Sequence, residues 1–103
     1  MKLSIVERIY CIAILNGYQG TIDVMKKVLD DAGKLAISDK EKEEFDFKQD
    51  GNMVTWNPKK EKEVEIELSK DVKDFIYKTI KEKEKEGKIT FEDKAAITLM
   101  EKL

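Results

Sequence analysis

Five hydroxyl residues divide this chain into segments, because each stands where a helix can begin. Each is followed within three positions by an acidic side chain; the five are Ser4, Thr21, Ser38, Ser69 and Thr90. A serine or threonine before a helix accepts a hydrogen bond from an amide of the first turn, and an acidic residue in that turn adds to the stabilisation. We therefore predict five helix starts at these positions.

The first half of the chain is expected to form an N-terminal helical subassembly. Residues 5–15 are apolar on nearly every side, so this helix should lie at the centre of the fold, with Ile9 and Ile12 nearly inaccessible to solvent. The second helix has an apolar face at helical spacing, made of Ile22, Met25, Leu29 and Ala32. Residues 39–44 are expected to form a short third helix.

From residue 45 the apolar period changes from that of a helix to that of a strand. Phe45 and Phe47 alternate with charged residues, residues 50–52 favour a hairpin turn, and residues 53–56 are rich in strand formers. Further along, three apolar residues alternate strictly with glutamates: Val64, Ile66 and Leu68. We predict a three-stranded antiparallel β-meander whose last strand is half buried.

Two C-terminal helices complete the predicted α+β fold. The first covers residues 70–86, carries a run of alternating lysine and glutamate in its second half, and ends at Gly87. The second follows Thr90 and has an apolar face made of Phe91, Ala95, Leu99 and Leu103, with Met100 beside it. Because a short helix is marginal in water, this face should pack against the same chain or a second copy.

Composition favours one small folded domain over residues 1–103. Hydrophobic residues make up 41% of the chain, enough for a core, and charged residues make up another 41%. A domain of this length can bury a modest core without a metal ion or disulfides. The 20 basic and 22 acidic residues nearly cancel, which favours neither a polyanion nor a membrane surface as partner.

The only cysteine, Cys11, lies in an apolar run and is predicted to be buried and unreactive. A chain that cannot form an internal disulfide fits a reducing, cytoplasmic location. The apolar run around Cys11 is too short to span a bilayer, and Glu7 and Arg8 interrupt the pattern of a secretion signal. We therefore expect no membrane insertion.

No catalytic, cofactor-binding or metal-binding residue is predicted. The chain has no histidine, so it lacks the commonest general base near neutral pH and the commonest nitrogen ligand for metals. It contains no glycine-rich phosphate-binding motif, and its carboxylates are interleaved with lysines on predicted solvent faces. We expect a protein that is not an enzyme and needs no cofactor.

Four residues are candidates for partner binding: Tyr18, Trp56, Met100 and Leu103. Tyr18 lies in a loop with glycines on either side, and loops often carry function. Trp56 precedes the Asn57-Pro58 turn, and packing over the sheet is the favoured explanation for it. Met100 and Leu103 end the last helix, where part of the apolar face is expected to stay exposed, and exposed apolar patches commonly mark partner sites.

A DNA-binding winged helix is the alternative interpretation, because two helices, a short helix and a hairpin follow one another. The segment that would read DNA, residues 39–44, holds two lysines against four acidic residues, so phosphates would repel it. It also lacks the arginine and amide side chains on which base readout depends. We therefore do not expect nucleic acid as a partner.

Three segments, Leu3–Arg8, Phe47–Asn57 and Ile80–Thr90, resemble small uncharacterised proteins encoded by bacteriophages and prophages. The resemblance covers most of the chain, implies a phage or integrated-element origin, and assigns no functional residue. The sequence as a whole thus predicts a small accessory protein in the cytoplasm, which acts by binding an unknown protein partner or a second copy of itself.

Overall fold

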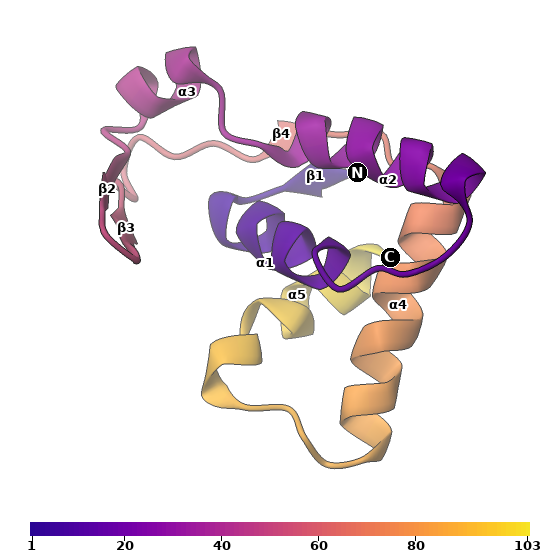
Figure 1. Ribbon diagram of the computed structural model, residues 1–103. Coiled ribbons are helices and arrows are strands. Elements are labelled where there is room, and N and C mark those ends of the chain that lie inside the picture. Colours follow the sequence, from indigo (N-terminus) through magenta and orange to yellow (C-terminus); the bar gives the residue numbers. More distant parts are fainter.

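All five predicted caps begin a helix or a helical turn in the computed structural model, which describes residues 1–103 (Figure 1). The first four caps open α1 (Ile5–Leu15), α2 (Ile22–Leu35), α3 (Asp39–Glu44) and α4 (Lys70–Lys85). At Ser4 and Ser38 the side chain accepts from the amide three residues later, while Glu7 and Glu41 accept from the amides of Ser4 and Ser38. The first four helix starts predicted from the sequence are therefore confirmed.

The last helix begins later than predicted. Phe91–Asp93 form a short 3-10 turn, η1, and α5 spans only Ala95–Lys102. A 3-10 turn has three residues per turn, so it moves Phe91 out of line with the face formed by Ala95 and Leu99. Those two residues are buried, whereas Phe91 is 83% exposed. The prediction that Phe91 packs on this face is therefore wrong.

The strands form two separate pairs. β2 (Lys48–Asp50) and β3 (Met53–Thr55) make the predicted antiparallel hairpin, with Gly51 at a φ of 62° in its turn. β4 (Val64–Glu65) pairs with β1 (Lys2–Leu3) at the start of the chain. The predicted three-stranded meander is therefore wrong.

Burial explains why β4 pairs with β1 and not with the hairpin. Ile66 and Leu68, directly after β4, are both buried in the core, as is Leu3 of β1. The hairpin strands are exposed apart from the half-buried Val54, so they offer no apolar face for these residues. A strand with one apolar side lies where that side can be buried, which for β4 is next to the core. β1 lies beside the core as well and provides the edge with which β4 pairs.

The core lies where four helices meet. α1 contacts α2, α4 and α5, and Figure 1 shows it in the middle of this group. The fully enclosed core residues come from every one of these helices and from β1; they include Leu3, Cys11, Leu35, Val72, Ile76 and Leu99. The predicted central position of the first helix is therefore confirmed.

Within α1, however, the buried residues are not those predicted. Ile9 and Ile12 are only half buried, while Glu7 and Arg8 are 2% exposed. Arg8 and Glu7 are accommodated inside because ionic and hydrogen-bonding partners reach them from other elements. The prediction for Ile9 and Ile12 is therefore wrong, because charged residues of this helix face inward at the expense of the isoleucines.

The apolar face of α2 is also displaced from the predicted one. Val28 and Leu35 are buried, whereas Ile22 and Leu29 are 77% and 65% exposed. The main helix contacts of α2 are with α1 and α4, so it buries a narrow stripe and leaves apolar residues at the edges of that stripe in solvent.

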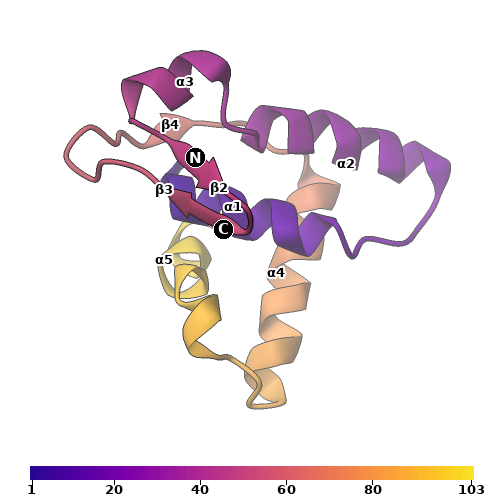
Figure 2. The same cartoon turned by 60° about the vertical axis from the view of Figure 1, so that its left-hand side comes forward.

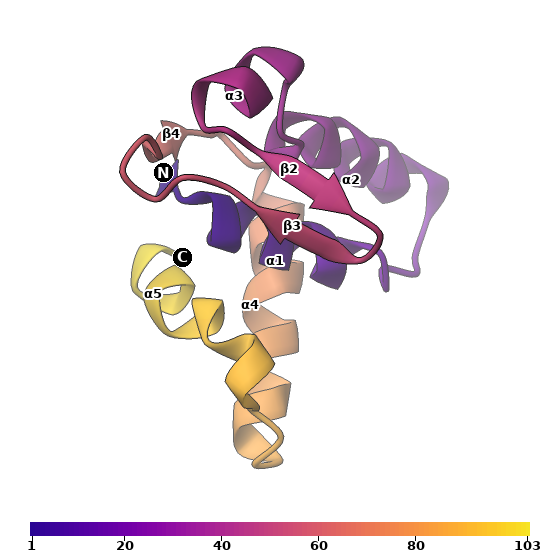
Figure 3. The same cartoon turned by 90° about the vertical axis from the view of Figure 1, so that its left-hand side faces the viewer.

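The elements fall into two regions. We call β1, α1, α2, β4, α4, η1 and α5 the helical body, and residues 38–61, which carry α3 and the hairpin, the arm. Figure 1 and Figure 2 show the arm to one side of the body, away from the C-terminal end of α4. Figure 3 looks onto the arm and shows β2 and β3 side by side in front of the body. None of the helices combines the length and the apolar composition needed to cross a membrane.

Candidate functional site

An apolar groove of about 330 Å³ lies between α4 and α5. Its apolar lining comes from both helices and from the loop between them: Ile80, Ile89, Ala96, Ile97 and Met100. Two charged residues of α4, Lys81 and Glu84, line the remaining side. We call this surface the α4–α5 groove.

Large apolar side chains stand in solvent in the groove and elsewhere on the segments that form it. Ile97 on α5 is 67% exposed, Phe91 in the preceding η1 is 83% exposed, and Ile89 is also exposed. Tyr77 is exposed one turn before Lys81, whose ammonium lies 5.7 Å from the centre of the tyrosine ring. An exposed apolar lining such as that of Ile97 and Ile89 is typical of a binding surface.

The charged side of the groove carries both signs. Lys81 Nζ lies 3.4 Å from a carboxylate oxygen of Glu84, and both side chains remain about half exposed. Ion pairs this exposed contribute little to stability, so these two groups are free to contact a partner.

The loop between the helices is held in place by one carboxylate, that of Asp93. Gly87 adopts a φ of 68°, which ends α4 and lets the chain turn back. Asp93 is buried and accepts hydrogen bonds from Tyr10 Oη at 2.7 Å, from Lys83 Nζ at 2.8 Å, and from the amide and hydroxyl of Thr90. These bonds tie the loop to both α1 and α4, so Ile89 and Phe91 are presented in a defined position.

The same contacts change the ionisation of Asp93 and Tyr10. The Lys83 ammonium, with Thr90 and Tyr10 as further donors, holds the pKa of Asp93 well below its usual range. Burial and the hydrogen bond to the Asp93 carboxylate raise the pKa of Tyr10. Both groups with a shifted pKa, Asp93 and Tyr10, hold the loop in place. Neither of them lines the groove.

Of the four candidate residues, only Met100 lines the groove. Leu103 is half buried and packs against the core at the end of α5. Tyr18 packs edge-on against Phe75 of α4, with ring centres 4.9 Å apart. The structure thus brings Met100 to the groove and gives Tyr18 and Leu103 packing contacts, while their roles in binding stay predictions.

Trp56 lies on the arm, beside a second, shallower hollow lined by Val54, Thr55, Trp56, Pro58 and Glu61. Its indole N–H donates to Glu61 at 3.1 Å, and its ring stacks on Phe47 with centres 6.3 Å apart. Two of the five residues lining this hollow are hydrophobic, against five of seven in the α4–α5 groove. The α4–α5 groove is therefore the stronger candidate for a binding site.

The sequence reasoning missed Ile97 and Ile89, which provide much of the exposed apolar lining. A usable signal was present, because Ile97 lies off the apolar face predicted for its helix and Ile89 lies in the connecting loop, yet both are large and aliphatic. Isolated apolar surface residues are common, so this signal alone does not identify a site. The groove becomes visible only when α4 and α5 are placed together.

The groove offers few chemical groups other than apolar surface. Its only titratable residues are Lys81 and Glu84. Nowhere in the structure do three histidine, cysteine, aspartate or glutamate side chains gather as a metal site would require. Comparison with family models, curated proteins and solved structures finds no match for this chain. We therefore infer function from the shape and lining of the groove.

Proposed function

We propose that this chain is a small non-enzymatic protein that acts by binding another protein chain through the α4–α5 groove. The observation that supports this proposal is the exposed apolar lining of the groove, above all Ile97 at 67% exposure. Water contact with such a surface is unfavourable, and covering it on binding contributes about 25 cal/mol for each Å² of apolar area.

The shape of the groove favours a helical partner segment. It runs between two helices, and grooves of this kind typically accept the apolar face of a third helix, with anchors three or four residues apart. Charged side chains beside the apolar floor would then set the orientation of that helix.

The winged-helix alternative rests on the order of elements, and two observations weigh against it. α3, which would enter the major groove, buries none of its six residues, and it retains the acidic composition that opposes phosphate binding. The hairpin pairs with no third strand. The phage or prophage origin and the cytoplasmic location stay predictions.

A photo-crosslinking residue in place of Ile97 tests the proposed function in cells that produce the protein. The matched control carries the same residue in place of Leu29, which is 65% exposed on the outer side of α2. We expect crosslinked protein from position 97 and little or none from position 29. No crosslink from position 97, or equal yields from both positions, would overturn the proposal.

A further inference from the structure

We propose that the occupant of the α4–α5 groove is a second copy of this chain, in a two-fold symmetric pair whose α4 helices run antiparallel. This inference rests on the proposed function, because it assumes that the groove binds a protein chain, and it names that chain.

The charges of the groove select its occupant. Lys81 and Glu84 lie one helical turn apart and are both exposed, so a partner with charges of one sign would meet repulsion at one of them. A matching helix needs an acidic group opposite Lys81 and a basic group one turn away, opposite Glu84. This chain carries that pattern in α4 itself, read in the reverse direction.

A two-fold axis provides both contacts at once. If it passes between positions 81 and 84, Lys81 faces Glu84 of the second copy, and Glu84 faces Lys81 of the second copy. The same register also places Glu82 opposite Lys83 of the second copy, so residues 81–84 all meet the opposite charge. Beyond this stretch, Lys85 and Glu86 lie opposite Ile80 and Thr79, so no like charges meet.

The chain also supplies the apolar part of such an interface. Tyr77 lies on the same side of α4 as Lys81 and Glu84, while Ile97 stands exposed on the opposite wall of the groove. When each α4 enters the groove of the other copy, Tyr77 and Ile97 of the two copies are covered together. An exposed aromatic and an aliphatic side chain of this kind are the expected anchors of a small interface.

The part of α4 that would pair lies away from the arm. Figure 1 and Figure 2 show the C-terminal end of α4 on the opposite side of the molecule from α3, β2 and β3. The formal net charge is −2 per chain, so long-range repulsion between two copies is small.

Sedimentation equilibrium of the purified full chain tests the inference over micromolar to millimolar concentrations. We expect the mass to rise from that of one chain towards that of two. Ile97→Asp should weaken association by about tenfold or more, because a buried carboxylate replaces an apolar anchor. Leu29→Asp, on the outer side of α2, should associate as the unchanged protein does.

Charge reversal at the two-fold axis gives the sharper result. Lys81→Glu alone and Glu84→Lys alone each place like charges opposite one another twice, so each should associate several-fold more weakly. An equimolar mixture of the two variants restores both opposite-charge contacts, so it should associate about as strongly as the unchanged protein. Thermal melts of each variant check that the fold is retained.

A chain that stays monomeric throughout the concentration range, or a mixture that stays as weak as the single variants, overturns the second copy as occupant. If a monomeric chain still yields crosslinks from position 97 to a different protein, the proposed function stands and only this inference fails. If it yields no crosslinks, both fail.

Discussion

The helical body and the arm are held in place by different forces. The body is built around a cluster of twelve buried apolar residues drawn from β1, α1, α2, α4, α5 and the segment after β4, and no residue of the arm belongs to that cluster. The arm buries Phe45 alone among its apolar side chains. Its attachment to the body therefore depends chiefly on polar contacts.

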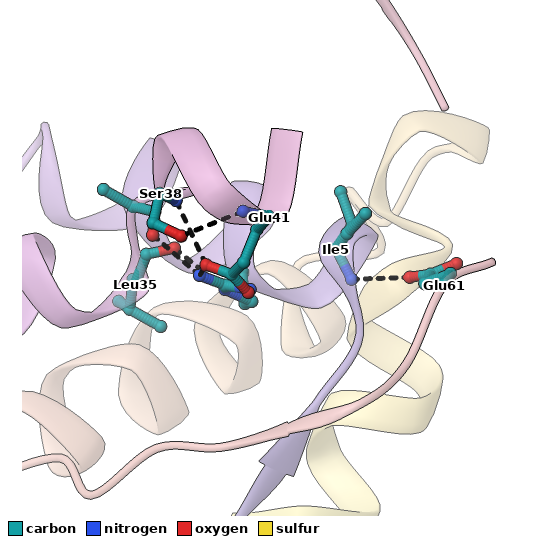
Figure 4. A network of polar contacts seen from close by, with 7 residues as sticks. Ile5, Leu35, Ser38, Glu41 and Glu61 are labelled. Carbon is teal, nitrogen blue, oxygen red and sulfur yellow. Dashed lines mark hydrogen bonds and ion pairs between the residues drawn. The ribbon is translucent and has the colours of Figure 1, made fainter. Parts of the chain in front are cut away.

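Arg8 is the main polar connection between the two regions. Figure 4 shows the network of polar contacts around Leu35, Ser38 and Glu41 to which it belongs. Its guanidinium donates to both carboxylate oxygens of Glu41 on α3, at 2.6 and 3.0 Å, and to the carbonyls of Leu35 and Ala36 at the end of α2. The bidentate geometry fixes the direction of α3 relative to α1. Arg8 thereby holds the turn between α2 and α3 as well as α3 itself.

Glu61 makes a second polar connection at the other end of the arm. One of its carboxylate oxygens accepts from the amide of Ile5 at 2.7 Å, and the other accepts from the indole of Trp56. Apolar packing tolerates small shifts, whereas hydrogen bonds of this kind lose strength steeply with distance and angle. We therefore expect the arm to open locally at lower free energy than the body does.

The largest effect is expected from the core of the body. Ile76→Ala removes a fully enclosed side chain of α4 and should lower the free energy of unfolding by about 2–5 kcal/mol. Leu29→Ala, at an exposed position of α2, should change it by less than about 0.5 kcal/mol. Denaturant unfolding followed by circular dichroism measures both, and similar losses would contradict the placement of the core.

A smaller and more local effect on stability is expected at Arg8, the polar connection between the body and the arm. Arg8→Met keeps the apolar length of the side chain but removes its donors, which leaves two carbonyls and one oxygen of the Glu41 carboxylate without their hydrogen bonds. We expect a loss of about 1–3 kcal/mol. Hydrogen exchange should speed up mainly in residues 38–61.

Thiol labelling of Cys11 shows whether the body stays closed in this variant. Cys11 is completely buried, and burial together with the nearby Glu7 carboxylate raises its pKa to about 12. Labelling should therefore remain slow in Arg8→Met at neutral pH. Fast labelling would mean that the arm and the body open as one unit.

The two regions also differ in how far the sequence predicted them. Helix starts were predicted correctly because a cap and its acidic partner lie within three residues of each other, as at Ser38 and Glu41. The hairpin was also predicted, but the pairing of β1 with β4 was not, because these strands are about sixty residues apart and only the shape of the core brings them together. Similarly, no local pattern indicates that Arg8 faces inward, since its partners belong to α2 and α3.

The candidate site was predicted only in part. Met100 was recognised from the end of an apolar face, but Ile97 lies off that face on the same helix. Its significance comes from Ile80 and Ile89, which reach the same groove from α4 and the following loop. The position of that loop depends in turn on Asp93 and its contact with Tyr10, at a separation along the chain that no short motif covers.

Titration of Glu41 gives the smallest but most specific test of the comparison. The hydrogen bonds from Arg8, aided by the Ser38 amide and opposed by burial, lower the pKa of Glu41 from 4.5 to about 2. A carboxyl group whose pKa is lower in the folded state stabilises the fold fully above its unfolded pKa, and this contribution is lost as the pH falls. The arm should therefore be fully attached at neutral pH and loosen between about pH 4.5 and 2.

Carboxyl ¹³C shifts measured against pH should show the Glu41 midpoint moving back up in Arg8→Met, while Asp93, whose low pKa depends on Lys83, keeps its midpoint. An unchanged Glu41 midpoint in the variant would show that Ser38 alone lowers the pKa of this carboxylate. Arg8 would then not be the polar connection between the arm and the body.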